Sequence, residues 1–171
     1  MEAKELLVEE RVPLKSRVWV SVADASCAML NTFVVSVGLT YYFTSFRGMN
    51  AELAATVWLL FGIWNAVNDP LFGYISDRTK NKLGRRIPYI RFGAPIIGLA
   101  FILSWLIIGG PNASQVVMFI QMTVLLFIFD ALYTAIATSI YVMPFEMAVS
   151  NKARSSIFIW KIIFSVFPLA V

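Results

Sequence analysis

The sequence contains no histidine and only one cysteine. The absence of histidine removes the commonest general base and metal ligand, so neither a Ser–His nor a Cys–His catalytic pair can form. The single cysteine, Cys27, lies in an apolar stretch and cannot form a disulfide within the chain, so we expect it to be a small buried side chain. No motif of the intramembrane aspartyl kind surrounds the aspartates, and we therefore do not expect an enzyme.

Charged residues are also scarce. They make up 14% of the 171 residues, whereas apolar residues make up 59%, and the mean hydropathy is +0.75. A soluble domain of this length keeps too much surface in water to hide so many apolar side chains, so the composition indicates a membrane protein. The net charge is +4, but the basic residues are not interleaved with aromatic ones, so we do not expect nucleic-acid binding.

Five long apolar segments follow a polar arm of residues 1–15. They cover approximately residues 16–46, 51–74, 87–108, 114–143 and 156–171. Each complete segment exceeds the roughly 20 residues that a helix needs to cross a bilayer, and strands are not expected because lipid offers no partner for their unpaired edges. We predict an all-α integral membrane bundle over residues 16–171, in which Pro144 ends the fourth helix. The fifth helix is still running at Val171, as expected for the front part of a longer protein.

The basic residues gather on one side of these segments. They are Arg11, Lys15 and Arg17, the cluster from Arg78 to Arg91, and Lys152, Arg154 and Lys161. The opposite side has only Arg47. The positive-inside rule therefore predicts that the N-terminal arm and the two basic loops are cytoplasmic, in a plasma or inner membrane.

Polar residues interrupt the second segment. Asn65, Asn68 and Asp69 are spaced i, i+3 and i+4, so they share one helix face. An ionisable residue at membrane depth is costly and calls for a partner or a purpose, and Pro70 loosens the backbone beside it. A carboxylate next to amide oxygens makes a candidate cation or hydroxyl site, with Asp69 as a candidate Na⁺ ligand. The alternative is that Asp69 is neutral or salt-bridged to another helix and only fixes packing.

Three other segments carry polar candidates for a cation or substrate site. Asp24, near Asn31 on the first, could line a site or form interhelical hydrogen bonds. Asp130, with Tyr133 on the fourth, could line a cavity or pair with a basic residue elsewhere. Lys161 on the fifth could reach a carboxylate, although snorkelling to the membrane surface is the simpler expectation.

The loop between the second and third segments is more patterned than topology alone requires. It carries Gly73, Asp77 and Arg78, followed by Gly84, Arg85 and Arg86. An acid at a helix end and arginines on a glycine-bearing loop can form charge-assisted hydrogen bonds that break and remake as helices slide. We therefore expect a conformational-switch loop, with a generic cytoplasmic basic loop as the alternative.

The stretch WNAVNDPLFG from Trp64 to Gly73, together with Asp77-Arg78-Thr79 and Gly84-Arg85-Arg86-Ile87-Pro88-Tyr89, resembles the glycoside–pentoside–hexuronide:cation symporters of the major facilitator superfamily. Weaker matches are Tyr41-Tyr42-Phe43-Thr44, Pro144, and Arg154 seven residues before Lys161, and we group Arg154 with the switch loop. The resemblance covers the first five of about twelve helices that the family implies. It implies a two-bundle transporter that works by alternating access, in which acids of the second helix couple transport to sodium or protons.

The sequence departs from the family at several of these positions. Asp69 matches the second acid of the coupling motif, but Asn65 stands where the first is often Asp. The sugar-binding acid of helix one is absent near residues 27–29, an acid of helix four is absent near 136–138, and Lys161 replaces an arginine. Asp130 is a candidate to compensate for the missing helix-four acid.

From the resemblance we expect a symporter of a small organic solute, such as a sugar or a glycoside-like compound. We expect Na⁺ or H⁺ as the coupling ion and no other cofactor. Its partners would be the solute, the bilayer and a C-terminal bundle in the same or another chain. The alternatives are a half-transporter or regulatory subunit without transport activity, and a carrier of an amphiphilic, lipid-like solute.

Overall fold

The computed structural model describes residues 12–36 and 38–169 of the chain, and all regular structure in this part is helical. The helices are α1 (Leu14–Val35), α2 (Gly38–Tyr41), the π-helix η1 (Tyr42–Phe46), α3 (Ala51–Arg78), α4 (Ile87–Ser104), α5 (Gln115–Met147) and α6 (Asn151–Leu169). The predicted all-α membrane architecture is confirmed, since the helices are apolar and long, and strands are absent from the described residues.

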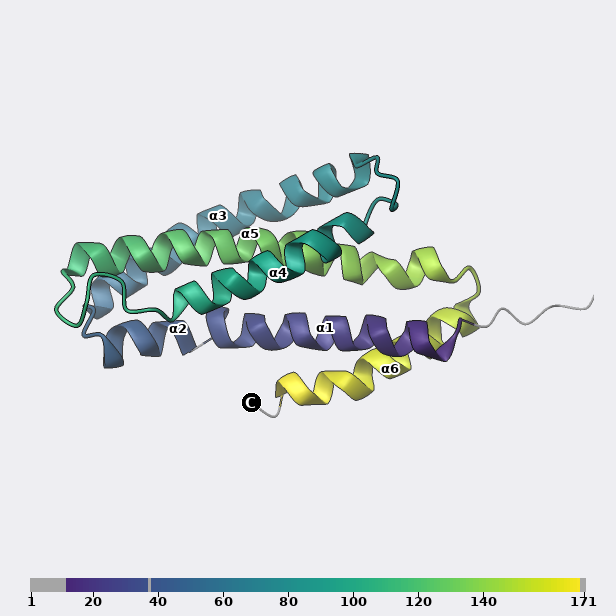
Figure 1. The fold of residues 1–171 in the computed structure, drawn as a ribbon, viewed down its shortest axis with the longest axis horizontal. Helices are drawn as coiled ribbons and strands as arrows, with labels where there is room; N and C mark the ends of the chain where they lie inside the picture. Colours follow the sequence, from purple (N-terminus) through teal and green to yellow (C-terminus); the bar gives the residue numbers. More distant parts are fainter. Residues whose placement is uncertain (1–11, 37, 170–171) are drawn as a thin grey trace, which may run out of the picture.

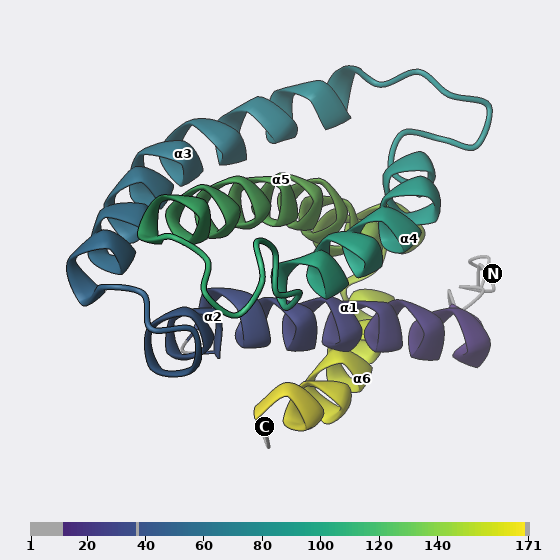
Figure 2. The same cartoon turned by 60° about the vertical axis from the view of Figure 1, so that its left-hand side comes forward.

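The helix α5 is the centre of the bundle. It packs against α3, α4 and α1, while α6 crosses α1, as Figures 1 and 2 show from two sides. Its side chains Met122, Leu126, Phe129 and Ile140 are almost completely buried in the main apolar core. A helix enclosed by neighbours in this way is the element on which polar groups from different helices can meet.

The two ends of the bundle differ in charge. The start of α1, the loop between α3 and α4 and the turn between α5 and α6 lie at one end (Figure 1), and these segments contain most of the basic residues. The η1–α3 turn with Arg47 and the α4–α5 turn lie at the other end. The basic segments therefore lie together at one end of the bundle, as the charge pattern of the sequence predicts. The side of the membrane that each end faces stays a prediction.

Several predicted helix ends are wrong. The segment 16–46 is not one helix, because α1 ends at Val35 and α2 and η1 follow. Pro144 does not end the fourth helix, since α5 continues to Met147 with Pro144 buried inside it. A proline in a membrane helix removes one backbone donor, and neighbouring helices can compensate for the loss. The loop before α6 is therefore shorter than predicted, since α6 begins at Asn151 and not near residue 156.

The second and third segments also end at other residues than predicted. The second extends past residue 74 to Arg78, and the third ends at Ser104 instead of 108. Among the described residues, three stretches are long and apolar enough to cross a membrane by length and composition: Leu14–Phe46, α4 and α5. With 28 residues, α3 is about 42 Å long at 1.5 Å per residue and is also long enough to span. Its asparagines and aspartates lower its hydropathy, and two of them belong to the site described below.

Arg47 ties the two turns at its end of the bundle together. Its Nη1 donates to Gln121 Oε1 at 2.5 Å, and its Nη2 donates to the carbonyl of Ile108 at 2.8 Å. Gln121 is 5% exposed and its Nε2 donates to the carbonyl of Leu106. One arginine therefore joins the turn after η1 to the turn before α5.

Replacing Arg47 with leucine is expected to destabilise the protein by about 1–3 kcal/mol, because Gln121 Oε1 is then buried without a donor. Thermal unfolding of the purified protein in detergent measures this effect. The matched control is Arg91→Leu, at an exposed position of α4, for which we expect a change within about 0.5 kcal/mol. Equal losses in the two variants would contradict the structural role of Arg47.

Candidate ion and switch sites

Four side chains of α3 and α5 form a hydrogen-bonded group that we call the α3–α5 polar cluster: Asn68, Asp69, Asp130 and Thr134. Asn68 Nδ2 donates to Asp130 Oδ2 at 2.8 Å and to Thr134 Oγ1 at 3.1 Å. Thr134 Oγ1 in turn donates to Asp69 Oδ1 at 3.0 Å. The hydroxyl of Thr134 therefore connects the two carboxylates through a continuous chain of polar contacts.

The helical repeat explains why these residues meet. Asp130 and Thr134 are four residues apart on α5 and lie on one face, which packs against α3. Asn68 and Asp69 are consecutive on α3, so their side chains diverge: Asn68 is 1% exposed, whereas Asp69 lies at an exposed position of α3. The cluster thus has a buried end at Asp130 and an accessible end at Asp69.

The cluster has unused capacity for a cation. Asn68 Oδ1 is buried and has no hydrogen-bond partner. Within the described residues, neither Asp69 nor Asp130 forms an ion pair with a lysine or arginine. Two carboxylates, an amide oxygen and a hydroxyl are hard oxygen donors, which suit Na⁺ or a proton better than a transition metal. The described residues contain no group of three Asp, Glu, His or Cys side chains able to hold a metal.

Two predicted members of the site do not join the cluster. Asn65, expected on the same face as Asn68 and Asp69, is half-buried, and its side chain makes no hydrogen bond within the described part of the chain. Tyr133 stacks on Phe129 with ring centroids 6.4 Å apart, rather than binding the cluster. Thr134 was missed by the sequence analysis, although its position four residues after Asp130 was a usable signal.

Asp24 and Lys161 form a separate ion pair between α1 and α6. Lys161 Nζ lies 3.1 Å from Asp24 Oδ1, and the side chains are 11% and 36% exposed. The expectation that Lys161 snorkels to the membrane surface is therefore wrong. Pairing lets both charges remain within the apolar bundle, where each alone would be costly. Of the alternatives for Asp24, the structure favours an interhelical partner.

Arg86 joins the ends of α3 and α5 in a group that we call the Arg86 junction, made of Ser76, Asp77, Arg86 and Glu146. Its Nη2 contacts Asp77 Oδ1 at 2.7 Å, and its Nη1 donates to Ser76 Oγ at 2.8 Å. Its Nε lies 3.4 Å from Glu146 Oε1, and Arg86 is only 9% exposed. Glu146 was not predicted, because the fourth helix was expected to end before it.

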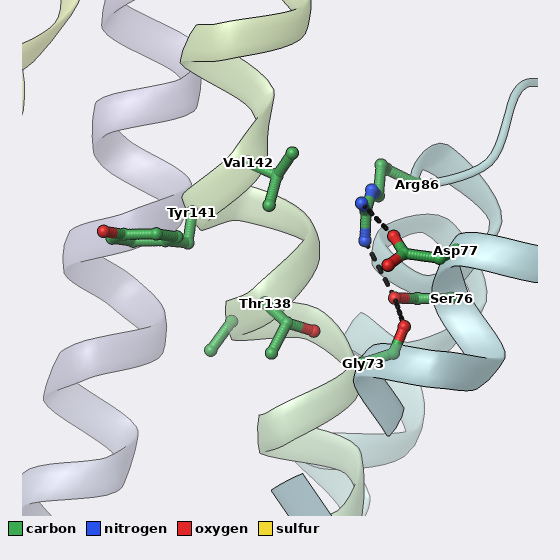
Figure 3. A pocket seen from close by; sticks show the side chains of 8 residues that line it. Gly73, Ser76, Asp77, Arg86, Thr138, Tyr141 and Val142 are labelled. Carbon is green, nitrogen blue, oxygen red and sulfur yellow. Dashed lines mark hydrogen bonds and ion pairs between the residues drawn. The ribbon is translucent and has the colours of Figure 1, made fainter. Parts of the chain in front are cut away.

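A cavity of about 400 Å³ adjoins the Arg86 junction. Figure 3 shows Arg86, Asp77 and Ser76 on one side of it and Thr138 and Val142 of α5 on the other. The cavity therefore lies between the ion pair and the part of α5 from Ala137 to Val142.

Other predicted members of the switch loop lie apart from the junction. The Arg78 guanidinium stacks on the ring of Tyr74, 4.1 Å from its centroid, and Arg85 is exposed. Arg154 donates from Nε to the carbonyl of Ala148 at 2.8 Å and lies far along the chain from Asp77. Gly73 lines the cavity next to the junction, and Gly84 has a φ of +95°, which permits the tight turn before Arg86.

Comparison with known proteins gives these sites a context. An uncharacterized symporter of Synechocystis is 28% identical over 134 residues, which cover 75% of this chain and 24% of that protein. The putative glycoside/cation symporter YagG of Escherichia coli is 24% identical over 151 residues, which cover 88% of this chain and 32% of the relative. The sodium-dependent lysophosphatidylcholine symporter 1 of Xenopus tropicalis is 28% identical over 81 residues, 47% of this chain and 14% of the relative.

No solved structure matches the chain. The chain spans between 14% and 32% of the length of the three relatives named above. The family model described as "MFS/sugar transport protein" matches residues 21–170, which is nearly the whole chain. The resemblance noted in the sequence is thereby confirmed: the chain is a multi-pass integral membrane protein and belongs to the MFS/sugar transport protein family.

Proposed function

We propose that these residues form the N-terminal helical bundle of a cation-coupled symporter and that the α3–α5 polar cluster binds the coupling ion. The observation that carries this proposal is the buried, unpartnered Asn68 Oδ1 beside two carboxylates that lack a basic partner. A bound Na⁺, or a proton shared with a carboxylate, would give that oxygen a partner and reduce the local negative charge. The names of the relatives support ion coupling in the family.

The geometry of the cluster supports a route for the ion. Asp69 is at an exposed position and Asp130 is buried, so an ion would meet Asp69 first and then gain Asp130 and Asn68 as partners. Hydrogen bonding through Thr134 would transmit the presence of the ion from α3 to α5. We expect this change to alter how the bundle packs against the rest of the transporter as it alternates between its two open states.

The solute that we propose is small and organic. A sugar or glycoside agrees with the family description and with the name of the Escherichia coli relative. A lysophospholipid is the second candidate, because one relative is named for lysophosphatidylcholine transport. The N-terminus and the Arg86 junction are proposed to face the cytoplasm, according to the distribution of basic residues.

Uptake by the full-length protein in proteoliposomes tests this function. We expect accumulation of a glycoside, or of lysophosphatidylcholine, above its external concentration only when a sodium or proton gradient is imposed. Parallel assays with each gradient identify the coupling ion, and the two solute classes identify the substrate. Equilibration without dependence on either ion would contradict coupling, and a gene product of the mass of these 171 residues would favour a half-transporter.

A further inference from the structure

The loop after α3 forms a basic recess at the surface of the membrane-spanning bundle. A cavity of about 490 Å³ is lined by Asp77, Arg78, Thr79, Lys80 and Arg85. Asp77 is already engaged by Arg86 at 2.7 Å. In the described part of the chain, none of the three basic lining residues forms an ion pair. The recess therefore presents an excess of positive charge, because its acidic lining residue is already paired with Arg86.

Only some of the hydrogen-bond donors in this recess are free to bind an anion. Thr79 Oγ1 has one proton and donates it to the carbonyl of Ile75, so in its bond with Tyr89 it accepts from the phenol. Both hydroxyl protons are therefore used, and an anion would depend on the charged side chains. Arg78 stacks its face on Tyr74, which leaves the N–H groups at the edge of the guanidinium free to donate.

An apolar groove lies next to the recess. A second cavity, of about 420 Å³, lies between α3, α4 and α5. Its lining residues are Phe72, Thr79, Pro88, Tyr89, Phe92, Gly93, Ile96, Ala131, Leu132 and Ala135, so it shares Thr79 with the basic recess. From Tyr89 to Ile96 the groove follows α4 for about 10 Å at 1.5 Å per residue. The small lining residues Gly93, Ala131 and Ala135 allow close approach of an occupant.

We propose that the recess and the groove together bind one anionic phospholipid, with its phosphate held by Arg78, Lys80 and Arg85 and an acyl chain along α4 in the groove. A basic loop alone attracts anionic membranes in general, and an apolar groove alone accommodates any lipid chain. The shared residue Thr79 places the two cavities next to each other, so together they match the two chemical parts of a single lipid. A soluble anion would leave the groove unused.

Native mass spectrometry of the full-length protein tests the site, with phosphatidylglycerol as the probe and phosphatidylcholine of the same chains as the neutral comparison. We expect selective retention of phosphatidylglycerol. The Lys80→Gln/Arg85→Gln double variant is expected to bind it roughly 30-fold more weakly, since each basic residue near a membrane surface contributes about fivefold. The matched control, Lys82→Gln/Arg91→Gln, removes the same charge from exposed residues outside both cavities and should retain selectivity.

Two further measurements separate the parts of the site. Ala131→Phe should weaken phosphatidylglycerol retention by filling the groove, with every basic residue intact, and inorganic phosphate should not compete with the lipid. The proposal is overturned if the two double variants lose binding equally, if phosphate competes fully, or if wild-type protein retains both lipids equally because another segment covers the recess. The competition with phosphate and the comparison of the two lipids use the wild-type protein, so they do not depend on the folding of a variant. Sodium binding at the α3–α5 polar cluster is measured separately, so failure of the lipid site and failure of the proposed function can be told apart.

Discussion

Replacing Asp69 or Asp130 with asparagine is expected to reduce ion-driven solute uptake to background while the protein still inserts in the membrane. Either change removes one of the two carboxylates that would hold the ion, and asparagine keeps an oxygen that can accept from Thr134 or from Asn68. Binding can also be measured directly, as a melting temperature that rises with sodium but not with potassium. At sodium concentrations about 100-fold above Kd, the free energy of unfolding of the wild type is expected to rise by about 2.7 kcal/mol, and that of the variants should not change.

Glu52→Gln is the matched control, because it removes one carboxylate from the exposed first turn of α3, far along the helix from Asp69. We expect its uptake and its response to ions to equal those of the wild type. If Asp69→Asn and Asp130→Asn both accumulate solute normally under a sodium or a proton gradient, the α3–α5 polar cluster only packs the helices. If a proton gradient alone drives uptake, the melting response to sodium should be absent in all proteins.

Replacing Lys161 with methionine is expected to destabilise the protein by about 1–3 kcal/mol. The substitution leaves the Asp24 carboxylate without its partner at 3.1 Å. Breaking a fully buried ion pair costs about 3–5 kcal/mol, and the lower range applies here because 36% of the Asp24 side chain is exposed. Asp24→Asn should destabilise the protein less than Lys161→Met only if the unpaired lysine can reach solvent, because the lysine charge then does not stay buried without a partner.

The double variant Asp24→Asn/Lys161→Met distinguishes a true pair from two independent residues. Because it leaves no unpaired charge in the bundle, we expect it to be more stable than Lys161→Met alone, by a difference that thermal unfolding in detergent measures. Lys82→Met, at an exposed loop position, is the control for loss of a lysine. Additive losses in the double variant would show that Asp24 and Lys161 do not stabilise one another.

Hydropathy was sufficient to predict the number and order of the long helices, because a bilayer leaves the helix as the simplest way to pair every backbone group. It was insufficient for the helix ends. Pro144 was expected to stop the fourth helix, but the loss of one backbone donor is tolerated within α5. The break after Val35 is followed by Gly38, where a Cβ would clash with the carbonyl oxygen of Phe33, but glycine is so common in membrane helices that it did not mark a break by itself.

The candidate site was predictable only in part, for a different reason. Helical periodicity identifies the face on which Asn68 and Asp69 lie, but it does not identify the helix that this face meets. The partners Asp130 and Thr134 follow from the packing of α3 on α5, which is a tertiary property. For the same reason the partner of Lys161 was not foreseen. That these residues bind ion and solute stays a prediction until binding is measured.

The single continuous helix α5 contributes to three separate polar groups. Gln121 meets Arg47 near one end, Asp130 and Thr134 face α3 in the middle, and Glu146 meets Arg86 at the other end. From Gln121 to Glu146 the helix extends about 38 Å at 1.5 Å per residue. Gln121 and Glu146 lie on nearly the opposite face of α5 from Asp130, since 9 and 16 residues at 3.6 residues per turn correspond to about half a turn beyond whole turns. A rotation of the helix that re-aims Asp130 therefore also turns the contacts at both ends.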